Sequence, residues 1–371
     1  MRFLFIIQGE GRGHMTQAIA FSALLEKSGQ ELVAVILGKS KRRVVPEFFT
    51  TQITAPIYLV ESPNFEADRA EKKILLAKTI IKNLWKLKKF GKSLSQIHSV
   101  VKETEPDIIL NFYDLLGGLY NGIYRPRARY WVIGHQYLNL HPEFIFAPAR
   151  GLEKLCFQAN TFLTRLGAEE TLALSFNSLS EQPGLRVVPP LLRDQVKQLS
   201  TSLDNFFLCY IVNPGYSDEV IHYAKANPEL EIKAFWDKKD IPETFQALPN
   251  LTFYQVHDQR FLQEMAKCKG LICTSGFESI CEAYYLGKPV MTIPVEGQYE
   301  QACNAIDAAR VGAGIPSKYF DFGKFEEAIN QLAGKPEKFR QWENSWSVIL
   351  SELTTGSTQN QERNQRILSF S

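Results

Sequence analysis

Short apolar runs alternate with amphipathic segments along the first half of the chain. Residues 2–8 form an apolar run, residues 15–29 repeat apolar positions at helical spacing, and residues 31–38 form a second apolar run. This order predicts a strand, a helix and a second strand. Two more runs, at 106–114 and 129–135, are rich in Ile, Tyr, Trp and Val, as buried parallel strands usually are. We therefore expect a doubly wound parallel sheet in the first half.

The same alternation restarts after a connector. Paired prolines followed by a polar stretch occupy residues 187–205, a composition typical of a link between domains. A chain of 371 residues is also too long for one ordinary core. The expected fold class is therefore α/β, with Rossmann-like domains at residues 1–190 and 204–344. A C-terminal helix at about 345–371 has apolar residues at helical spacing and is expected to pack back on the first domain.

The composition argues against several classes of protein. The chain is 45% hydrophobic and 22% charged, and its net charge of +2 shows no basic excess that would indicate a nucleic-acid partner. No stretch reaches the roughly 18–20 apolar residues of a membrane-spanning helix, and the first apolar run is too short for a signal peptide. We expect a cytoplasmic protein. Its six cysteines lack the spacing of zinc ligands, so they are expected to be buried thiols.

The segment 270–305 carries the most informative pattern. An apolar run ends in a Ser-Gly turn that leads into a helix, so free amide groups and the positive end of the helix dipole face the carboxyl edge of the sheet. Open α/β sheets bind ligands at that edge, and such a turn holds an anion such as a diphosphate through amides and hydroxyls, without a metal. Glu282, just inside the helix, is placed to accept hydrogen bonds from a ribose diol.

This segment resembles the donor-binding region of GT-B glycosyltransferases of family 28 and family 1, which include the N-acetylglucosaminyltransferase that completes lipid II. The shared features are the Ser-Gly turn, a Ser three residues after the glycine and a Glu six residues after it. The resemblance implies that Ser275, Gly276 and Ser279 contact the diphosphate of a nucleotide-sugar. It also implies that Glu282 contacts the ribose.

Two further features extend the resemblance. Glu300 and Gln301 resemble the acidic-Gln pair that contacts the donor sugar in these families. Thr274 stands where plant-type members of family 1 carry a phosphate-binding His, a departure that suits the bacterial branch, and we expect Thr274 to belong to the donor site. The resemblance implies a UDP-sugar or a dTDP-sugar as the donor.

A glycine-rich turn follows the first apolar run, in the sequence QGEGRGHM at residues 8–15. The same families place such a loop, often followed by His, directly after the first strand. Gly9, Gly11 and Gly13 are therefore expected to let the backbone approach the donor phosphates across the cleft. An alternative is a dinucleotide-binding loop, although His14 stands where close helix packing favours Gly or Ala.

His14 is the candidate general base. An imidazole, with an ordinary pKa of roughly 6.5, suits the removal of a proton from an acceptor hydroxyl. In family 1 this His is paired with an Asp from the end of a later strand, and Asp114 is expected to orient the imidazole in the same way. The alternatives are that His14 has no chemical role and that Asp114 caps the following helix. His135, which resembles a residue at the same place in family 28, is the acceptor-side candidate.

A basic amphipathic segment runs from Lys72 to Lys92. Lysines alternate there with Ile, Leu and Trp85. Such a helix either packs its apolar side on the first domain or lies on an anionic membrane. A lipid-linked acceptor would give membrane contact a purpose, so the second hypothesis includes a peripheral position at the inner face of the membrane.

The resemblance implies the GT-B fold, in which two Rossmann-like domains face each other across a cleft. It also implies an inverting transfer of a sugar to a hydroxyl acceptor, in cell-envelope glycan or glycolipid synthesis. The chain contains no Asp-x-Asp metal motif, and we expect neither a metal nor a cofactor. Three alternatives stay open: a nucleotide-sugar 2-epimerase, a non-catalytic sugar-nucleotide-binding protein, and an NADP-dependent enzyme in which Arg42 and Arg43 would meet the 2′-phosphate.

Overall fold

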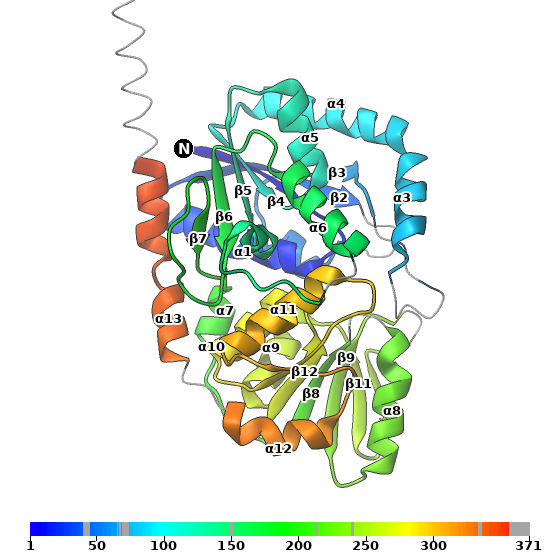
Figure 1. The fold of residues 1–371 in the computed structure, drawn as a ribbon. Coiled ribbons are helices and arrows are strands. Elements are labelled where there is room, and N and C mark those ends of the chain that lie inside the picture. Colours follow the sequence, from blue (N-terminus) through cyan, green and yellow to red (C-terminus); the bar gives the residue numbers. More distant parts are fainter. Residues whose placement is uncertain are drawn as a thin grey trace, which may run out of the picture.

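The computed structural model describes residues 1–39, 45–64, 66, 68, 74–148, 151–211, 214–238, 241–332 and 336–355. Arg42, Arg43, Lys72 and Lys73 and the C-terminal residues from 356 onward lie outside these ranges. Figure 1 shows two α/β domains, each with a central sheet flanked by helices. The expected GT-B architecture of two Rossmann-like domains is confirmed. Among the described helices, none combines the length and the apolar character that a membrane span requires.

The N-terminal domain has a seven-stranded parallel sheet in the order β3-β2-β1-β4-β5-β6-β7. Its strands are β1 (Arg2–Ile7), β2 (Glu31–Lys39), β3 (Ile57–Glu61), β4 (Ile108–Phe112), β5 (Arg129–Gly134), β6 (Glu170–Leu174) and β7 (Arg186–Val188). Its helices are α1 (Arg12–Lys27), α2 (Glu47–Gln52), α3 (Leu76–Leu84), α4 (Leu87–Thr104), α5 (Leu115–Tyr124), η1 (His135–Leu140), α6 (Gly151–Thr164) and α7 (Asp194–Lys197). The strand order reverses between β1 and β4, and doubly wound sheets bind ligands at the carboxyl side of such a point.

The C-terminal domain has a second seven-stranded sheet in the order β10-β11-β9-β8-β12-β13-β14. Its strands are β8 (Phe206–Ile211), β9 (Glu231–Trp236), β10 (Thr244–Leu248), β11 (Leu251–Gln255), β12 (Gly270–Thr274), β13 (Val290–Ile293) and β14 (Ile315–Pro316). Its helices are η2 (Pro214–Tyr216), α8 (Ser217–Ala226), α9 (Asp258–Lys267), α10 (Phe277–Tyr285), α11 (Tyr299–Arg310), α12 (Phe322–Leu332) and α13 (Glu337–Glu343). The edge strand β10 runs antiparallel to β11, and the other pairs are parallel. This sheet reverses its order between β8 and β12, next to the Ser-Gly turn.

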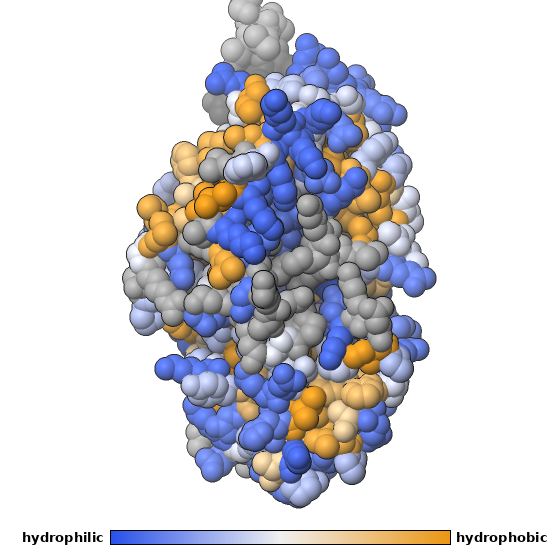
Figure 2. All heavy atoms as spheres, turned by 90° about the vertical axis from the view of Figure 1, so that its right-hand side faces the viewer, coloured by the Kyte–Doolittle hydropathy of each residue, from blue (hydrophilic) through white to orange (hydrophobic). Residues whose placement is uncertain are grey.

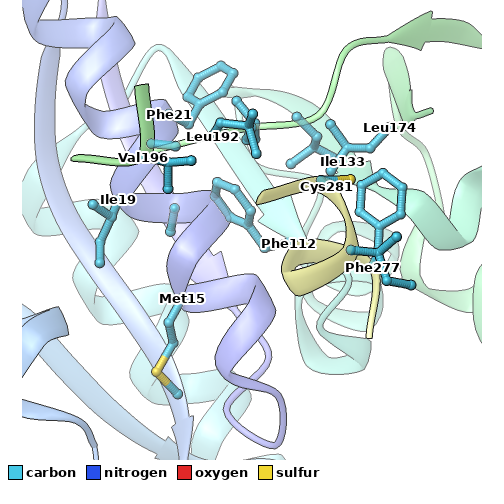
Figure 3. Close-up of a cluster of buried hydrophobic side chains, with 14 of the residues drawn as sticks. Met15, Ile19, Phe21, Phe112, Ile133, Leu174, Leu192, Val196, Phe277 and Cys281 are labelled. Carbon is cyan, nitrogen blue, oxygen red and sulfur yellow. The ribbon is translucent and has the colours of Figure 1, made fainter. Parts of the chain in front are cut away.

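One hydrophobic cluster continues from the first domain into the second. Figure 3 shows part of it, with side chains from β4, β5, α1, the connector and α10: Phe112, Ile133, Ile19, Phe21, Leu192, Val196, Phe277 and Cys281. Because close-packed apolar groups resist displacement, this cluster fixes α1 against α10. Both helices begin at the cleft between the domains, so their packing sets the geometry of the site.

The chain returns to the N-terminal domain after its second sheet. Residues 346–355 are helical. The indole nitrogen of Trp346 donates a hydrogen bond to the carbonyl oxygen of Pro190 at 2.9 Å, and its ring meets Phe21 edge-on at 5.8 Å. Glu352 forms an ion pair with Arg186 of β7. The C-terminal segment thus packs on the N-terminal domain beside the start of the connector.

Candidate active site

A cavity of about 450 Å³ lies between the two domains. The N-terminal domain contributes the turn after β1, the residues that follow β3 and β4, and parts of α3 and α6. The C-terminal domain contributes the β12–α10 turn and the start of α11. The predicted site residues that line this cavity are Gly11, Gly13, His14, Asp114, Thr274, Gly276, Ser279, Glu282, Glu300 and Gln301. The structure therefore gathers residues from both ends of the sequence in one cleft.

Two helices direct their N-termini at this cavity from opposite domains. Helix α1 begins after Gly11 and α10 after Gly276, and at neither position does a described side chain cap the helix. The first amide groups and the positive ends of both helix dipoles are thus available to a ligand. Gly13 lies so close to α10 that a Cβ atom there would stand 3.3 Å from Cγ of Glu278. Such an arrangement is suited to an anion.

The glycines of the turn after β1 have different roles. A Cβ atom at Gly9 would lie 1.6 Å from the carbonyl oxygen of Gly38, so only glycine lets this turn pass the end of β2. Gly11 and Gly13 line the cavity, whereas Gly9 does not. The expectation that Gly9 approaches a phosphate is therefore corrected, because packing inside the N-terminal domain accounts for this glycine.

His14 lies buried in the first turn of α1. Its Nδ1 atom is 3.1 Å from Oε1 of Gln17, and its Nε2 atom is 3.4 Å from Nε2 of Gln136. Burial lowers the pKa of the imidazole to about 4, so the ring is neutral at physiological pH. The ring stacks against Tyr113, with centroids 6.2 Å apart. Tyr113 has a φ angle of 58°, a strained conformation for a residue other than glycine, of the kind that gathers at functional sites.

Asp114 does not hold His14. Its carboxylate accepts hydrogen bonds from the amides of Leu116 and Gly117 and from the hydroxyl of Ser62, at 2.8, 3.3 and 2.8 Å. The predicted pairing is thus corrected in favour of the helix cap, because α5 begins directly after Asp114 and its first amides take the carboxylate. Gln17 contacts the Nδ1 atom instead.

The carboxylate of Glu282 is fixed at the cavity wall by Arg193. Oε1 of Glu282 accepts hydrogen bonds from Nε and Nη2 of Arg193 at 3.0 and 2.5 Å, and Arg193 also pairs with Asp258. Arg193 and Asp258 line the cavity, although neither residue belongs to a recognisable sequence motif. The arginine comes from the connector after the paired prolines, where a buried cation has no sequence signature.

Glu300 and Gln301 are also held in place at the cleft. Oε1 of Glu300 accepts a hydrogen bond from Gln136 at 2.8 Å, and burial raises the pKa of this carboxyl to about 7. Oε1 of Gln301 accepts a hydrogen bond from the amide of Val295 at 2.9 Å. Gln136 belongs to η1, so it connects the N-terminal domain to α11 across the cleft.

Ser275 and His135, like Gly9, are predicted residues that do not line the cavity. Ser275 is fully buried within the turn, and its carbonyl oxygen accepts a hydrogen bond from Asn304 at 3.0 Å. His135 is held by the carbonyl oxygen of Leu174 at 2.8 Å and stacks on Phe277 with ring centroids 3.9 Å apart. Acceptor binding by His135 is therefore corrected: it packs between the domains, and its neighbour Gln136 reaches the cavity.

Comparison with known proteins gives consistent matches. Residues 1–332 match the model of glycosyl transferase family 1. The chain is similar to an uncharacterized glycosyltransferase of Methanosarcina acetivorans, with 23% identity over 351 residues that cover 86% of this chain and 84% of that protein.

Solved structures share the fold at low sequence identity. The glycotransferase of kitacinnamycin has a TM-score of 0.57 and 13% identity, covering 92% of this chain and 93% of that one. The spinosyn rhamnosyltransferase SpnG, complexed with thymidine diphosphate, has a TM-score of 0.54 and 16% identity, covering 96% of each chain. MurG of Acinetobacter baumannii has a TM-score of 0.53 and 14% identity, covering 95% of this chain and 99% of that one.

Proposed function

The chain belongs to glycosyl transferase family 1 and is a glycosyltransferase; we propose that it transfers a sugar from a nucleoside diphosphate donor to a hydroxyl acceptor. The observation that carries this proposal is the convergence of α1 and α10, two helices without side-chain caps among the described residues, on one cavity that also contains a buried neutral His14. The thymidine diphosphate bound to SpnG supports a pyrimidine nucleotide, so the proposed donor is a UDP-sugar or a dTDP-sugar.

The donor lies mainly on the C-terminal domain. Its diphosphate faces the first amides of α10 and the hydroxyl of Ser279, and Glu282, fixed by Arg193, accepts hydrogen bonds from the ribose. Glu300 and Gln301 face the sugar. As the diphosphate leaves, its growing negative charge meets amide dipoles that are already oriented. The proposal therefore needs no metal ion.

The acceptor oxygen attacks the anomeric carbon on the face opposite the diphosphate. The new carbon–oxygen bond forms as the bond to the phosphate oxygen breaks, and the electron pair of the broken bond leaves with the diphosphate. The hydroxyl proton passes to Nε2 of His14. Because the ring is neutral, it can accept this proton as the oxygen becomes acidic in the transition state. A single displacement of this kind inverts the anomeric configuration.

The acceptor side of the cavity lies between α3 and α6. Thr79 and Asn83 of α3 and Phe157 and Asn160 of α6 line it. The outer faces of the same region expose large apolar side chains, namely Ile81, Trp85, Leu87, Leu152, Leu155 and Phe162. Figure 2 shows hydrophobic and hydrophilic residues side by side on the face that carries α3. We propose a lipid-linked acceptor, with lysines and apolar groups of this face contacting an anionic membrane.

A product assay tests the proposed activity. The protein is incubated with UDP- and dTDP-sugars and a panel of hydroxyl acceptors in EDTA, and products are separated by chromatography. Release of nucleoside diphosphate that depends on acceptor, with a new glycoside, is expected. A free sugar epimerised at C2 and formed without acceptor would instead support the 2-epimerase. Donor binding without any turnover across the panel would support the non-catalytic binding protein.

A further inference from the structure

His14 lies at the centre of a chain of hydrogen bonds that crosses the cleft twice. On one side, Nε2 of Gln17 donates to Oε1 of Glu278 at 2.6 Å. On the other side, Nε2 of Gln136 donates to Oε1 of Glu300 at 2.8 Å. The two glutamines belong to the N-terminal domain and the two glutamates to the C-terminal domain. Through these two glutamines, His14 is connected to Glu278 of α10 and to Glu300 of α11 in the opposite domain.

The direction of these hydrogen bonds determines which nitrogen of His14 carries the proton. A carboxylate oxygen accepts, so the amide nitrogen of Gln17 faces Glu278 and its oxygen faces His14. That oxygen needs a donor, which places the proton of the neutral ring on Nδ1. The amide nitrogen of Gln136 approaches Nε2, as a donor approaches a lone pair. Nε2 is thus left without a proton, as a base must be.

Glu278 lies where the two domains meet, next to Gln17 and Gly13 of α1. It is buried in the first turn of α10, and its Oε2 atom has no hydrogen-bond partner among the described residues. Burial raises its pKa to about 8, with Glu282 adding to the rise and Arg193 opposing it. A proton on Oε2 leaves Oε1 free to accept from Gln17. The resemblance on which the donor site rests assigns Glu278 no role, and its one described hydrogen bond crosses to Gln17.

We propose that Glu278 is a positioning residue that acts through Gln17 to hold His14 in the Nδ1–H tautomer, so that Nε2 becomes the base only when the two domains are in contact. In this enzyme the pair of Gln17 and Glu278 takes the orienting role expected of Asp114. The catalytic consequence rests on the proposed function of His14, whereas the tautomer does not. The two ideas can therefore fail separately.

Nitrogen NMR of protein labelled with ¹⁵N-histidine tests the tautomer directly. The signals of His14 are assigned by their loss in His14→Gln. The wild type is expected to show Nδ1 protonated and Nε2 unprotonated. Glu278→Met, which keeps the shape and removes the acceptor, is expected to populate the Nε2–H tautomer, whereas Glu278→Gln keeps an accepting oxygen and is expected to retain Nδ1–H.

A matched control separates positioning from general contact between the domains. Asp237 pairs with Arg12, at the start of α1, at 3.0 Å across the same cleft, but it does not contact Gln17. Asp237→Asn is therefore expected to leave the His14 tautomer unchanged. If Glu278→Met does not fold, Gln17→Met removes the same link from the other side and carries the same expectation.

Activity measurements then separate this proposal from the proposed function. Glu278→Met is expected to lower kcat by about 10²-fold with little change in the donor KM, and Glu278→Gln to restore it. A tautomer shift in a protein that transfers no sugar would support the positioning and contradict the proposed function. An Nε2–H tautomer in the wild type, or an unchanged Nδ1–H tautomer in folded Glu278→Met, would overturn the positioning even in an active enzyme.

Discussion

Most of the donor wall of the cleft comes from two neighbouring stretches of chain, residues 274–282 and 295–301, whereas the opposite wall is assembled from segments scattered between residues 8 and 160. The donor wall relies on main-chain amides at the start of a helix, which any sequence that folds this way provides. The opposite wall relies on side chains such as His14. The protonation of this side chain depends on its hydrogen bonds with residues that in turn contact the other domain. In the proposed function, binding of the donor is thus a local property, whereas activation of the acceptor depends on how the two domains pack against each other.

The largest effect, on the free energy of unfolding, is expected from Arg193 of the connector, which pairs with Glu282 in the donor wall. Arg193→Met leaves the buried carboxylate of Glu282 and the partly buried carboxylate of Asp258 without their cation, so it should lower the free energy of unfolding by about 3–5 kcal/mol. Urea unfolding measures this change. Lys27→Met breaks the exposed pair of Lys27 with Asp194 and serves as the control, with a cost of at most about 1 kcal/mol. An equal loss of free energy of unfolding in the two variants would mean that the ion pairs of Arg193 do not stabilise the fold more than an exposed pair does.

Removing the proposed base should lower the rate of transfer without weakening donor binding. His14→Ala is expected to lower kcat by about 10²-fold or more, because no general base remains to accept the proton of the acceptor hydroxyl. The affinity for the donor nucleotide should change little, since the amides of α10 and Glu282 remain. Steady-state kinetics and calorimetry on the same preparation measure both quantities. Full activity in His14→Ala would show that the mechanism is wrong even though the fold is right.

Low pH should destabilise the protein through His14. Burial lowers the pKa of its imidazole from 6.5 to about 4, so between these values the unfolded chain binds a proton that the folded chain does not. The free energy of unfolding therefore falls as the pH is lowered from 6.5 towards 4, by up to about 1.4 kcal/mol per pH unit. Urea unfolding at pH 7 and pH 5 should show a smaller loss in His14→Gln. An identical loss of free energy of unfolding between pH 7 and pH 5 in the wild type and in His14→Gln would mean that folding does not lower the pKa of His14.

The smallest effect is expected on the outer face of the acceptor wall. Trp85 is 87% exposed, and Trp85→Ser should reduce co-sedimentation with phosphatidylglycerol vesicles at low salt by a few fold. Leu203 in the connector is 78% exposed, and Leu203→Ser is the control that should not change it. High salt should release the wild type, because the attraction is electrostatic in part. Failure of the wild type to sediment at low salt would remove the membrane contact.

The same contrast explains what the sequence could predict. The turn at Thr274–Gly276 and the carboxylate of Glu282 follow one another within a strand-turn-helix, so local spacing was enough to find them. The hydrogen bond from Gln17 to Glu278 joins residues that are 261 positions apart in the sequence, and no local pattern predicts that contact. Asp114 was placed correctly at the end of a strand, but the same position allows a helix cap, and its partner was therefore misassigned.

The fold shows a similar division. The apolar runs of β1, β2, β4, β5 and β12 made these strands predictable, because buried parallel strands are apolar on both faces. The edge strand β10 was missed, since its Thr244–Leu248 sequence is largely exposed and lacks such a run. Arg193 was missed because a single arginine after two prolines is an ordinary connector residue until the fold buries it.

The proposed function requires that the cleft bind a nucleoside diphosphate at the N-terminus of α10. Titration calorimetry of the wild type and Glu282→Gln with UDP, dTDP, GDP and NADP⁺ in EDTA measures this binding. UDP or dTDP is expected to bind without metal, and Glu282→Gln is expected to weaken this binding. Binding of NADP⁺ alone would show that the donor site is misassigned and that the turn after β1 binds a dinucleotide.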